Sequence, residues 1–348
     1  MKVNKKKLII SITSATLAVL LAASLITVYA VSVTIYDASF NYRFETNEEN
    51  SFELSNFPTL TRSEKHTFKS NNGQTLVGYL YEQCIPVEPE NDENASTDAE
   101  QIAPAEAEQI LPLEKKGVVI FAHGFGGGGQ RGYMDIFNYL CSRGYYVFAY
   151  DATANDESEG EVVGGLPQGV IDLDYAIDYA KALDELKDLP IMLMGYSWGG
   201  MSVVNVLNFQ PDVTAVASLA GWDKSMNMIE HEGKEMVGGV ATLMLPFASV
   251  YEYTKYGTYS FSTAMKGFEN SDCAVMIVHG EKDTTIPIAY GYDTYFEKYG
   301  DDDRFTFKKY EDRDHDVMKT ADDKLDLELM AEVADFFDAS IKADTTDK

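Results

Sequence analysis

Short apolar runs alternate with longer amphipathic stretches along most of the chain. The apolar runs carry few polar positions, which is typical of strands buried on both faces of a parallel sheet. Residues 168–187 instead place Val170, Leu173 and Ile177 on one side, which is the spacing of a helix. The expected strands are 117–122, 145–150, 191–194, 213–219, 274–278 and 304–310, and the expected helices are 133–143, 168–187, 201–209, 288–299 and 324–341. This alternation predicts an α/β fold with a doubly wound, mostly parallel sheet.

The start of the domain is marked by two further strand-like stretches, 64–70 and 75–82. They flank Asn72-Gly73, and Asn-Gly between apolar runs is a strong hairpin signal. We therefore expect one domain over residues 64–341, and we interpret residues 37–63 as a spacer that leads into it.

Two stretches interrupt the alternation of strands and helices. Residues 86–114 are rich in Glu, Asp, Ala and Pro, and we interpret them as an acidic surface insertion. Residues 222–271 are rich in methionine and aromatic side chains. We interpret this second stretch as a cap over the sheet, because flexible methionines and broad aromatic surfaces suit a pocket for apolar groups.

The N-terminal stretch predicts a membrane-directed segment. Four lysines, at positions 2, 5, 6 and 7, precede an uncharged stretch from Leu8 to Ile35. At ~1.5 Å per residue this stretch can cross a bilayer core of ~30 Å, and the lysines place the domain on the outer side. Residues 1–36 are either an uncleaved signal anchor or a signal peptide cleaved after Ala30. We favour the anchor because the apolar stretch runs past Ala30, so we expect an extracytoplasmic, membrane-anchored protein, with secretion as the alternative.

The composition of the chain argues against several classes of binding partner. A net charge of −28 over 348 residues argues against nucleic acid and against docking on an anionic membrane surface. The three cysteines, Cys84, Cys141 and Cys273, are widely spaced and form neither a disulfide framework nor a metal-binding pair. We expect no cofactor and no metal.

The most informative motif is Gly195-Tyr196-Ser197-Trp198-Gly199. It follows an apolar strand and precedes a helix, which is the context of a nucleophile elbow. In such a turn the serine hydroxyl stands exposed at the edge of the sheet, and the flanking glycines allow the close packing of strand and helix. Ser197 is therefore the candidate nucleophile.

A second motif, His123-Gly124-Phe125 followed by four glycines, comes directly after the buried strand 117–122. Such a loop can cradle a dinucleotide, but its spacing fits that fingerprint poorly. The other interpretation is an oxyanion loop whose backbone amides point into the site.

A serine nucleophile needs a base and an acid that orients the base. Among the five histidines, only His315 lies in a loop after the last strand, where the chain order of elbow enzymes places the base. His66, His123, His231 and His279 have better structural or surface interpretations. For the acid, chain order favours Asp283, while Glu281 and Asp223 are rivals.

With these assignments the chain resembles the α/β-hydrolase superfamily over roughly residues 64–341. The resemblance rests on His123-Gly124-Phe125-Gly126, the Ser197 elbow, His279-Gly280-Glu281-Lys282-Asp283 and Asp314-His315, and it is nearest to the serine aminopeptidase and monoacylglycerol-lipase-like branch of bacterial membrane-anchored hydrolases. It implies an oxyanion hole made by the backbone amides of Phe125 and Trp198.

These features predict a serine hydrolase that cleaves small carboxylic esters with apolar acyl groups through an acyl-enzyme. A serine peptidase or aminopeptidase acting on small peptides is the alternative, because Asp223, Glu230 or Glu232 could bind a free N-terminus. A non-catalytic binding protein on a hydrolase scaffold is a third possibility, since the fold alone does not guarantee catalysis.

Overall fold

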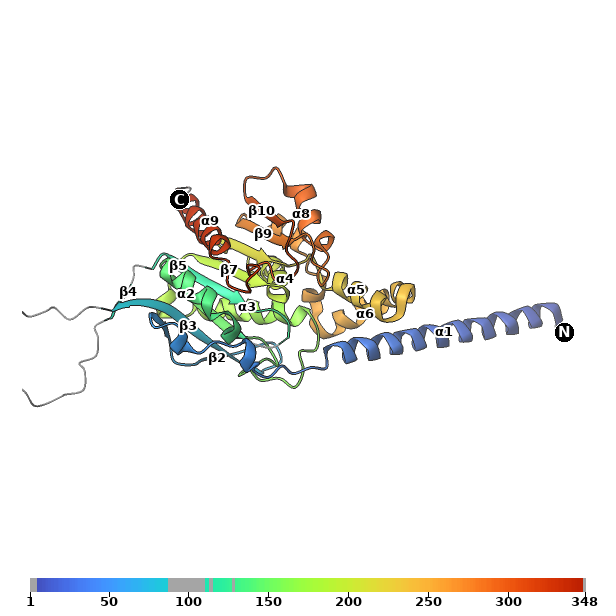
Figure 1. Cartoon of the computed structure of the whole chain (residues 1–348). Coiled ribbons are helices and arrows are strands. Elements are labelled where there is room, and N and C mark those ends of the chain that lie inside the picture. The colour runs from blue at the N-terminus through green and yellow to red at the C-terminus, as the bar shows by residue number, and fades with distance from the viewer. Residues whose placement is uncertain (1–4, 87–109, 113–114, 127–128, 347–348) are drawn as a thin grey trace, which may run out of the picture.

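A computed structural model describes residues 5–86, 110–112, 115–126 and 129–346 of the chain. Most of the acidic insertion expected at 86–114 lies outside these residues. Figure 1 shows a central sheet with helices packed on both faces, and a long N-terminal helix that extends away from the domain.

The described residues form a ten-stranded sheet in the order β1-β3-β6-β5-β7-β8-β9-β10, with β2 and β4 also paired to β3. The strands are β1 Leu60–Arg62, β2 His66–Lys69, β3 Thr75–Pro86, β4 Ile110–Pro112, β5 Gly117–Ala122, β6 Tyr145–Asp151, β7 Ile191–Tyr196, β8 Ala215–Leu219, β9 Ala274–Gly280 and β10 Phe305–Tyr310. The strands from β6 to β10 in this order are parallel, and β3 is antiparallel to its neighbours. The predicted mostly parallel sheet is thus confirmed, and so is the hairpin of β2 and β3.

The sheet has a hydrophobic core on each of its two faces, and this explains the unbroken apolar runs in the sequence. Along β5, Val118 and Ile120 enter the core on one face, whereas Val119 and Phe121 enter the core on the other. Successive side chains of a strand point to opposite faces, so a strand covered on both sides has no position left for a polar residue.

Helices α2 (Met134–Ser142) and α9 (Leu327–Thr346) cover one face of the sheet. Helices α3 (Pro167–Lys181), α4 (Trp198–Asn205), α7 (Ala264–Asn270) and α8 (Tyr292–Tyr299) cover the other. Several bounds differ from the sequence-based ones. The helix expected over 168–187 ends at Lys181, and the helix expected over 288–299 divides into a 3₁₀ turn at Ile288–Tyr290 and α8.

The stretch 222–271, which we interpreted as a cap, forms helices inserted between β8 and β9. They are α5 (Ser225–Val237), α6 (Ala241–Tyr256) and α7, joined by 3₁₀ turns at Gly238–Val240 and Gly257–Phe261. α6 lies beside the C-terminal part of α1 (Lys5–Phe40), as Figure 1 shows, and α5 packs against α6.

The chain after α1 follows the surface of the domain closely. Arg43 donates hydrogen bonds to the backbone oxygens of Asp156, Ser158 and Gly160 at 2.6, 2.9 and 3.0 Å. Further along, Leu60–Arg62 forms β1 against β3. The stretch that the sequence suggested as a spacer is therefore bonded to the domain over much of its length.

Candidate active site

The elbow stands where β7 passes into α4. Ser197 has φ of 55° and ψ of −115°, a strained left-handed conformation for a residue with a side chain. A Cβ at Gly199 would lie 1.9 Å from the backbone oxygen of Ala122, and a Cβ at Gly195 would lie 2.3 Å from the oxygen of Gly199. Only glycine fits at these two positions, and this close packing holds Ser197 in its strained turn.

The turn places Ser197 within reach of a histidine from a distant loop. His315 Nε2 lies 2.9 Å from Ser197 Oγ, and His315 Nδ1 lies 2.8 Å from Asp283 Oδ2. The structure thus brings together the three side chains that the sequence singled out, from the loops that follow β7, β9 and β10.

Asp283 is held by several donors. Its Oδ1 accepts from the backbone N–H groups of Thr285 at 2.9 Å and Ile286 at 2.7 Å. Its Oδ2 also lies 3.3 Å from Nε2 of His279, which donates to the backbone oxygen of Ile286 at 3.0 Å. Burial opposes the charge, but the hydrogen bonds from His279, His315 and Ile286 outweigh it and hold the pKa of Asp283 well below its ordinary value. Asp283 is therefore an ionised carboxylate facing the imidazole of His315.

The glycine loop runs beside Ser197. A Cβ at Gly124 would lie 3.6 Å from Ser197 Cβ, and the Gly124 amide donates to the Tyr133 hydroxyl at 3.1 Å. The Phe125 ring packs edge-on against the Trp198 ring, with 5.4 Å between centroids. Residues 127 and 128 of this loop lie outside the described residues.

Comparisons with known proteins bear on the fold and on the part of the chain that carries the elbow. A family model described as serine aminopeptidase, S33, matches residues 113–263, which contain the glycine loop and the elbow. An esterase from Pyrococcus furiosus superposes with a TM-score of 0.58 at 12% identity, covering 86% of this chain and 98% of the esterase. The chain therefore has the α/β-hydrolase fold.

Two other solved structures share the fold of the hydrolase. Est1E from Butyrivibrio proteoclasticus, solved with ferulic acid bound, gives a TM-score of 0.53 at 18% identity over 80% of this chain and 99% of that one. An acylaminoacyl peptidase from Pyrococcus horikoshii gives 0.50 at 15% identity over 76% of this chain and 39% of that one. A search of curated proteins finds no match. The family model and these neighbours support a serine hydrolase, and the α/β-hydrolase resemblance drawn from the sequence is confirmed at the level of the fold.

The other histidines of the hydrolase occupy structural positions. His123 donates from Nδ1 to the backbone oxygen of Gly124 at 2.7 Å and accepts the Ala152 amide at Nε2 at 2.9 Å, and burial lowers its pKa. It is a neutral brace at the start of the glycine loop. His66 contacts the Tyr179 hydroxyl at 3.0 Å, and the ring of His231 packs against a tyrosine of the loop before α8.

The two rival acids have other partners. Glu281 forms an ion pair with Lys309 at 3.4 Å on the surface. Asp223 accepts the backbone amide of Met265 at 3.1 Å and so fixes the start of α7.

A contact that the sequence did not reveal supports the histidine from its far side. The Tyr196 hydroxyl donates to Asp316 Oδ1 at 2.6 Å, and the Tyr196 ring lies 5.2 Å from the His315 ring. Burial and the bond to Asp316 raise the pKa of Tyr196 far above its usual range, so this hydroxyl keeps its proton. Tyr196 and Asp316 therefore together hold the loop that carries His315.

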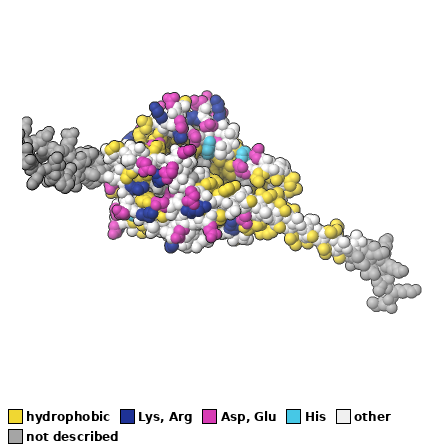
Figure 2. Space-filling view, turned by 60° about the horizontal axis from the view of Figure 1, so that its bottom comes forward, with side chains coloured by type: hydrophobic (Ala, Val, Ile, Leu, Met, Phe, Trp, Pro, Cys, Tyr) yellow, Lys and Arg dark blue, Asp and Glu magenta, His cyan; other side chains and the backbone are white. Residues whose placement is uncertain are grey.

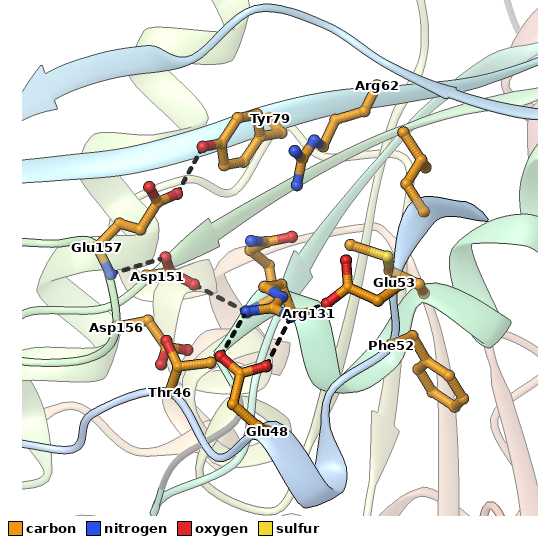
Figure 3. Close-up of a pocket in the computed structure, with 13 residues that line it drawn as sticks. Thr46, Glu48, Phe52, Glu53, Arg62, Tyr79, Arg131, Asp151, Asp156 and Glu157 are labelled. Carbon is orange, nitrogen blue, oxygen red and sulfur yellow. Dashed lines mark hydrogen bonds and ion pairs between the residues drawn. The ribbon is translucent and has the colours of Figure 1, made fainter. Parts of the chain in front are cut away.

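A polar pocket of about 420 Å³ lies at the end of the glycine loop, and Ser197 is not among its lining residues. Figure 3 shows Arg131 between Glu48 and Glu53, at 3.0 and 2.7 Å. In the same pocket Asp151 accepts the backbone N–H of Gln130 at 2.9 Å. Burial and the neighbouring charge of Asp156 raise the pKa of Asp151 to about 8. These bonds join the N-terminal segment to the sheet. Among the described residues, no group of His, Cys, Asp and Glu side chains is arranged to hold a metal ion.

Proposed function

We propose that the protein hydrolyses carboxylic esters with apolar acyl groups, with Ser197 as nucleophile, His315 as base and Asp283 as the acid that orients the base. The observation that carries the proposal is the continuous hydrogen-bonded line from Ser197 Oγ through the imidazole to the Asp283 carboxylate, with distances of 2.9 and 2.8 Å. The Ser197–His315 distance suits proton transfer, and the His315–Asp283 distance is that of the hydrogen bond which orients the base.

In this mechanism His315 Nε2 takes the proton of Ser197 as Oγ attacks the ester carbonyl. The tetrahedral oxyanion is held by the backbone amides of Phe125 and Trp198, each contributing ~3–4 kcal/mol. The imidazolium, stabilised by Asp283, returns its proton to the leaving alcohol, which leaves an acyl-enzyme. His315 then activates water, which releases the acid and regenerates the serine.

The preference for apolar acyl groups rests on the cap. Several buried or half-buried cap side chains are methionines and aromatic residues, which give an adaptable apolar surface. The structural neighbours include an esterase, and another neighbour was solved with ferulic acid bound. Small-molecule esters are therefore the favoured substrates.

A peptidase is the second candidate, because the matching family model is named for an aminopeptidase. An aminopeptidase needs a carboxylate for the free amine of its substrate. Of the residues suggested for this task, Glu230 pairs with Lys234 at 2.6 Å and Asp223 binds a backbone amide. These partners compete with a substrate amine at two of the three suggested carboxylates, and the third, Glu232, is exposed, so the peptidase stays the second candidate.

A serine-directed fluorophosphonate probe tests the proposal. We expect the wild-type protein to be labelled and Ser197→Ala to be unlabelled, while Ser142→Ala, which removes an exposed serine of α2, is labelled like wild type. Absence of labelling in the wild type would point to a binding protein. Turnover of aminoacyl anilides without turnover of p-nitrophenyl esters would favour the peptidase.

We also propose that α1 remains attached and anchors the domain outside the cell membrane. The helix contains a 28-residue apolar span, Thr13–Phe40. Within the most apolar 18-residue window of this span, 6% is buried against the rest of the protein. The alternative is secretion after cleavage. The intact mass of the protein decides between anchoring and secretion. A mass that corresponds to a chain beginning at Val31 would show that the proposed anchor has been cleaved off.

A further inference from the structure

The connection between α5 and α6 has an unusual surface. Residues 236–251 contain no charged side chain in a protein whose net charge is −28. Met236, Val237, Val240 and Leu243 are all largely exposed, Leu243 at 71%. We call these four residues the cap tip. Figure 2 shows hydrophobic side chains gathered over the cap and continuing along α1.

The contacts between α1 and α6 show which way the cap tip points. Tyr29 packs against Phe247 with 6.4 Å between ring centroids, and eight residues later Asp37 pairs with Lys255 at 3.2 Å. The two helices therefore run in the same direction, side by side. The start of α6 lies next to the part of α1 that precedes Tyr29.

The level of the bilayer follows from the same register. With the lysines at positions 5 to 7 on the inner side, an apolar core of ~30 Å is crossed by about 20 residues and ends near Tyr29. Beyond that level the contacts become polar. Tyr36 donates to Glu252 at 2.8 Å, and Asp37 accepts from Tyr251 at 2.8 Å. The outer edge of the hydrocarbon core thus lies near the Tyr29–Phe247 contact.

We propose that the cap tip inserts into the outer leaflet beside α1, with lipid acyl chains as its partner. Leu243 precedes Phe247 by four residues, which places it about 6 Å deeper at 1.5 Å per residue, and Val240 is deeper still. This depth matches the ~5–10 Å at which interfacial apolar elements are buried. The proposal rests on the anchoring function proposed for α1, and it makes the cap a second membrane contact.

Charge supports lipid as the occupant. An acidic protein is repelled from anionic headgroups, so contact through an uncharged apolar tip suits a neutral leaflet or the acyl region below the headgroups. Lys234 and Glu235 precede the tip and mark the end of the charged part of α5. A second copy of the chain is the competing occupant.

The full chain in phosphatidylcholine vesicles tests the proposal. Leu243→Cys, in a Cys84→Ser background, is labelled with an environment-sensitive fluorophore and quenched by lipids brominated on the acyl chains. Phe296→Cys on α8 is the matched control, because Phe296 is equally apolar and 51% exposed but belongs to a helix outside the cap tip. The other two cysteines are buried and do not compete for the label.

We expect quenching at position 243 to exceed quenching at position 296 by about threefold or more, as for an element buried in the interface. Equal quenching at the two positions would overturn the proposal. Blue-shifted emission at 243 that rises with protein density and ignores brominated lipid would assign the tip to a second copy, which also overturns it.

Fluorophosphonate labelling of Ser197 in the same vesicles separates this inference from the enzymatic one. Labelling without quenching at 243 means that the hydrolase proposal stands and the docking proposal fails. Quenching without labelling means the reverse. The intact mass of the vesicle-bound protein reports independently whether α1 is present.

Discussion

Replacing Asp283 by asparagine changes one atom in the proposed triad and reverses one hydrogen bond. The asparagine oxygen can still accept the loop amides of Thr285 and Ile286, at 2.9 and 2.7 Å in the wild type. Its NH₂ group then takes the place of Oδ2 and faces His315 Nδ1–H. Two donors cannot bond, so the imidazole moves its proton to Nε2, and that nitrogen can no longer accept from Ser197.

The size of the effect follows from this tautomer. The same exchange in a Ser-His-Asp protease lowers kcat about 10⁴-fold, which corresponds to about 5.5 kcal/mol in the barrier. The loss in folding stability is smaller, about 1–3 kcal/mol, because the site loses the contacts of Oδ2 with His315 and His279 while the loop amides keep their acceptor. We therefore expect Asp283→Asn to fold and to turn over ester about 10⁴-fold more slowly.

The assay is the initial rate on a soluble short-chain p-nitrophenyl ester, with thermal melting followed by circular dichroism. Glu281→Gln is the matched control, because it removes a carboxylate two residues away that pairs with Lys309 on the surface. Its rate should equal that of the wild type. An Asp283→Asn rate within tenfold of wild type, or a larger loss from Asp223→Asn, would refute the assignment of the acid.

Two further predictions concern stability. Glu252 is fully buried, and burial raises its pKa to about 7. A raised pKa in the folded state means that folding favours the protonated carboxyl. The free energy of unfolding therefore falls by about 3 kcal/mol as pH rises from about 4.5 to about 7. Glu252→Gln should make the decrease in Tm between about pH 5 and pH 8 smaller, and an unchanged decrease would contradict this. Gly199→Ala should abolish soluble folded protein, because the new Cβ would lie 1.9 Å from a backbone oxygen. Gly239→Ala, with nothing within 4 Å, should express and melt like wild type, and equal behaviour of the two variants would show that the elbow tolerates a side chain.

The parallel part of the fold could be predicted because each buried strand leaves an unbroken apolar run. The elbow could be predicted for a related reason, since its glycines are required by backbone approach and are visible in the sequence. Ser197 and His315 could then be paired by chain order alone. In the structure the two side chains lie in contact, with 2.9 Å between His315 Nε2 and Ser197 Oγ.

Other features leave no such trace. The strand Leu60–Arg62 has three residues, which is too short for any period to show. Arg43 is bound through three backbone oxygens, and a backbone oxygen is present at every position of a sequence. The expected buried role of His279 is seen, but its second contact, with Asp283, depends on the turn between them and could not be read from spacing.

The bonded course of the chain after α1 limits how far the enzyme can reach. A free linker of about 20 residues, the length between Phe40 and Leu60, would let a tethered domain wander roughly 25 Å from its anchor. Here the hydrogen bonds of Arg43 and the pairing of β1 with β3 hold the connecting segment against the domain, so it cannot act as a free linker. If α1 anchors the protein as we propose, the domain therefore samples only a thin layer above the bilayer. Esters that lie on the surface or diffuse along it pass the active site repeatedly, whereas esters dissolved a few nanometres away must first come down to the membrane.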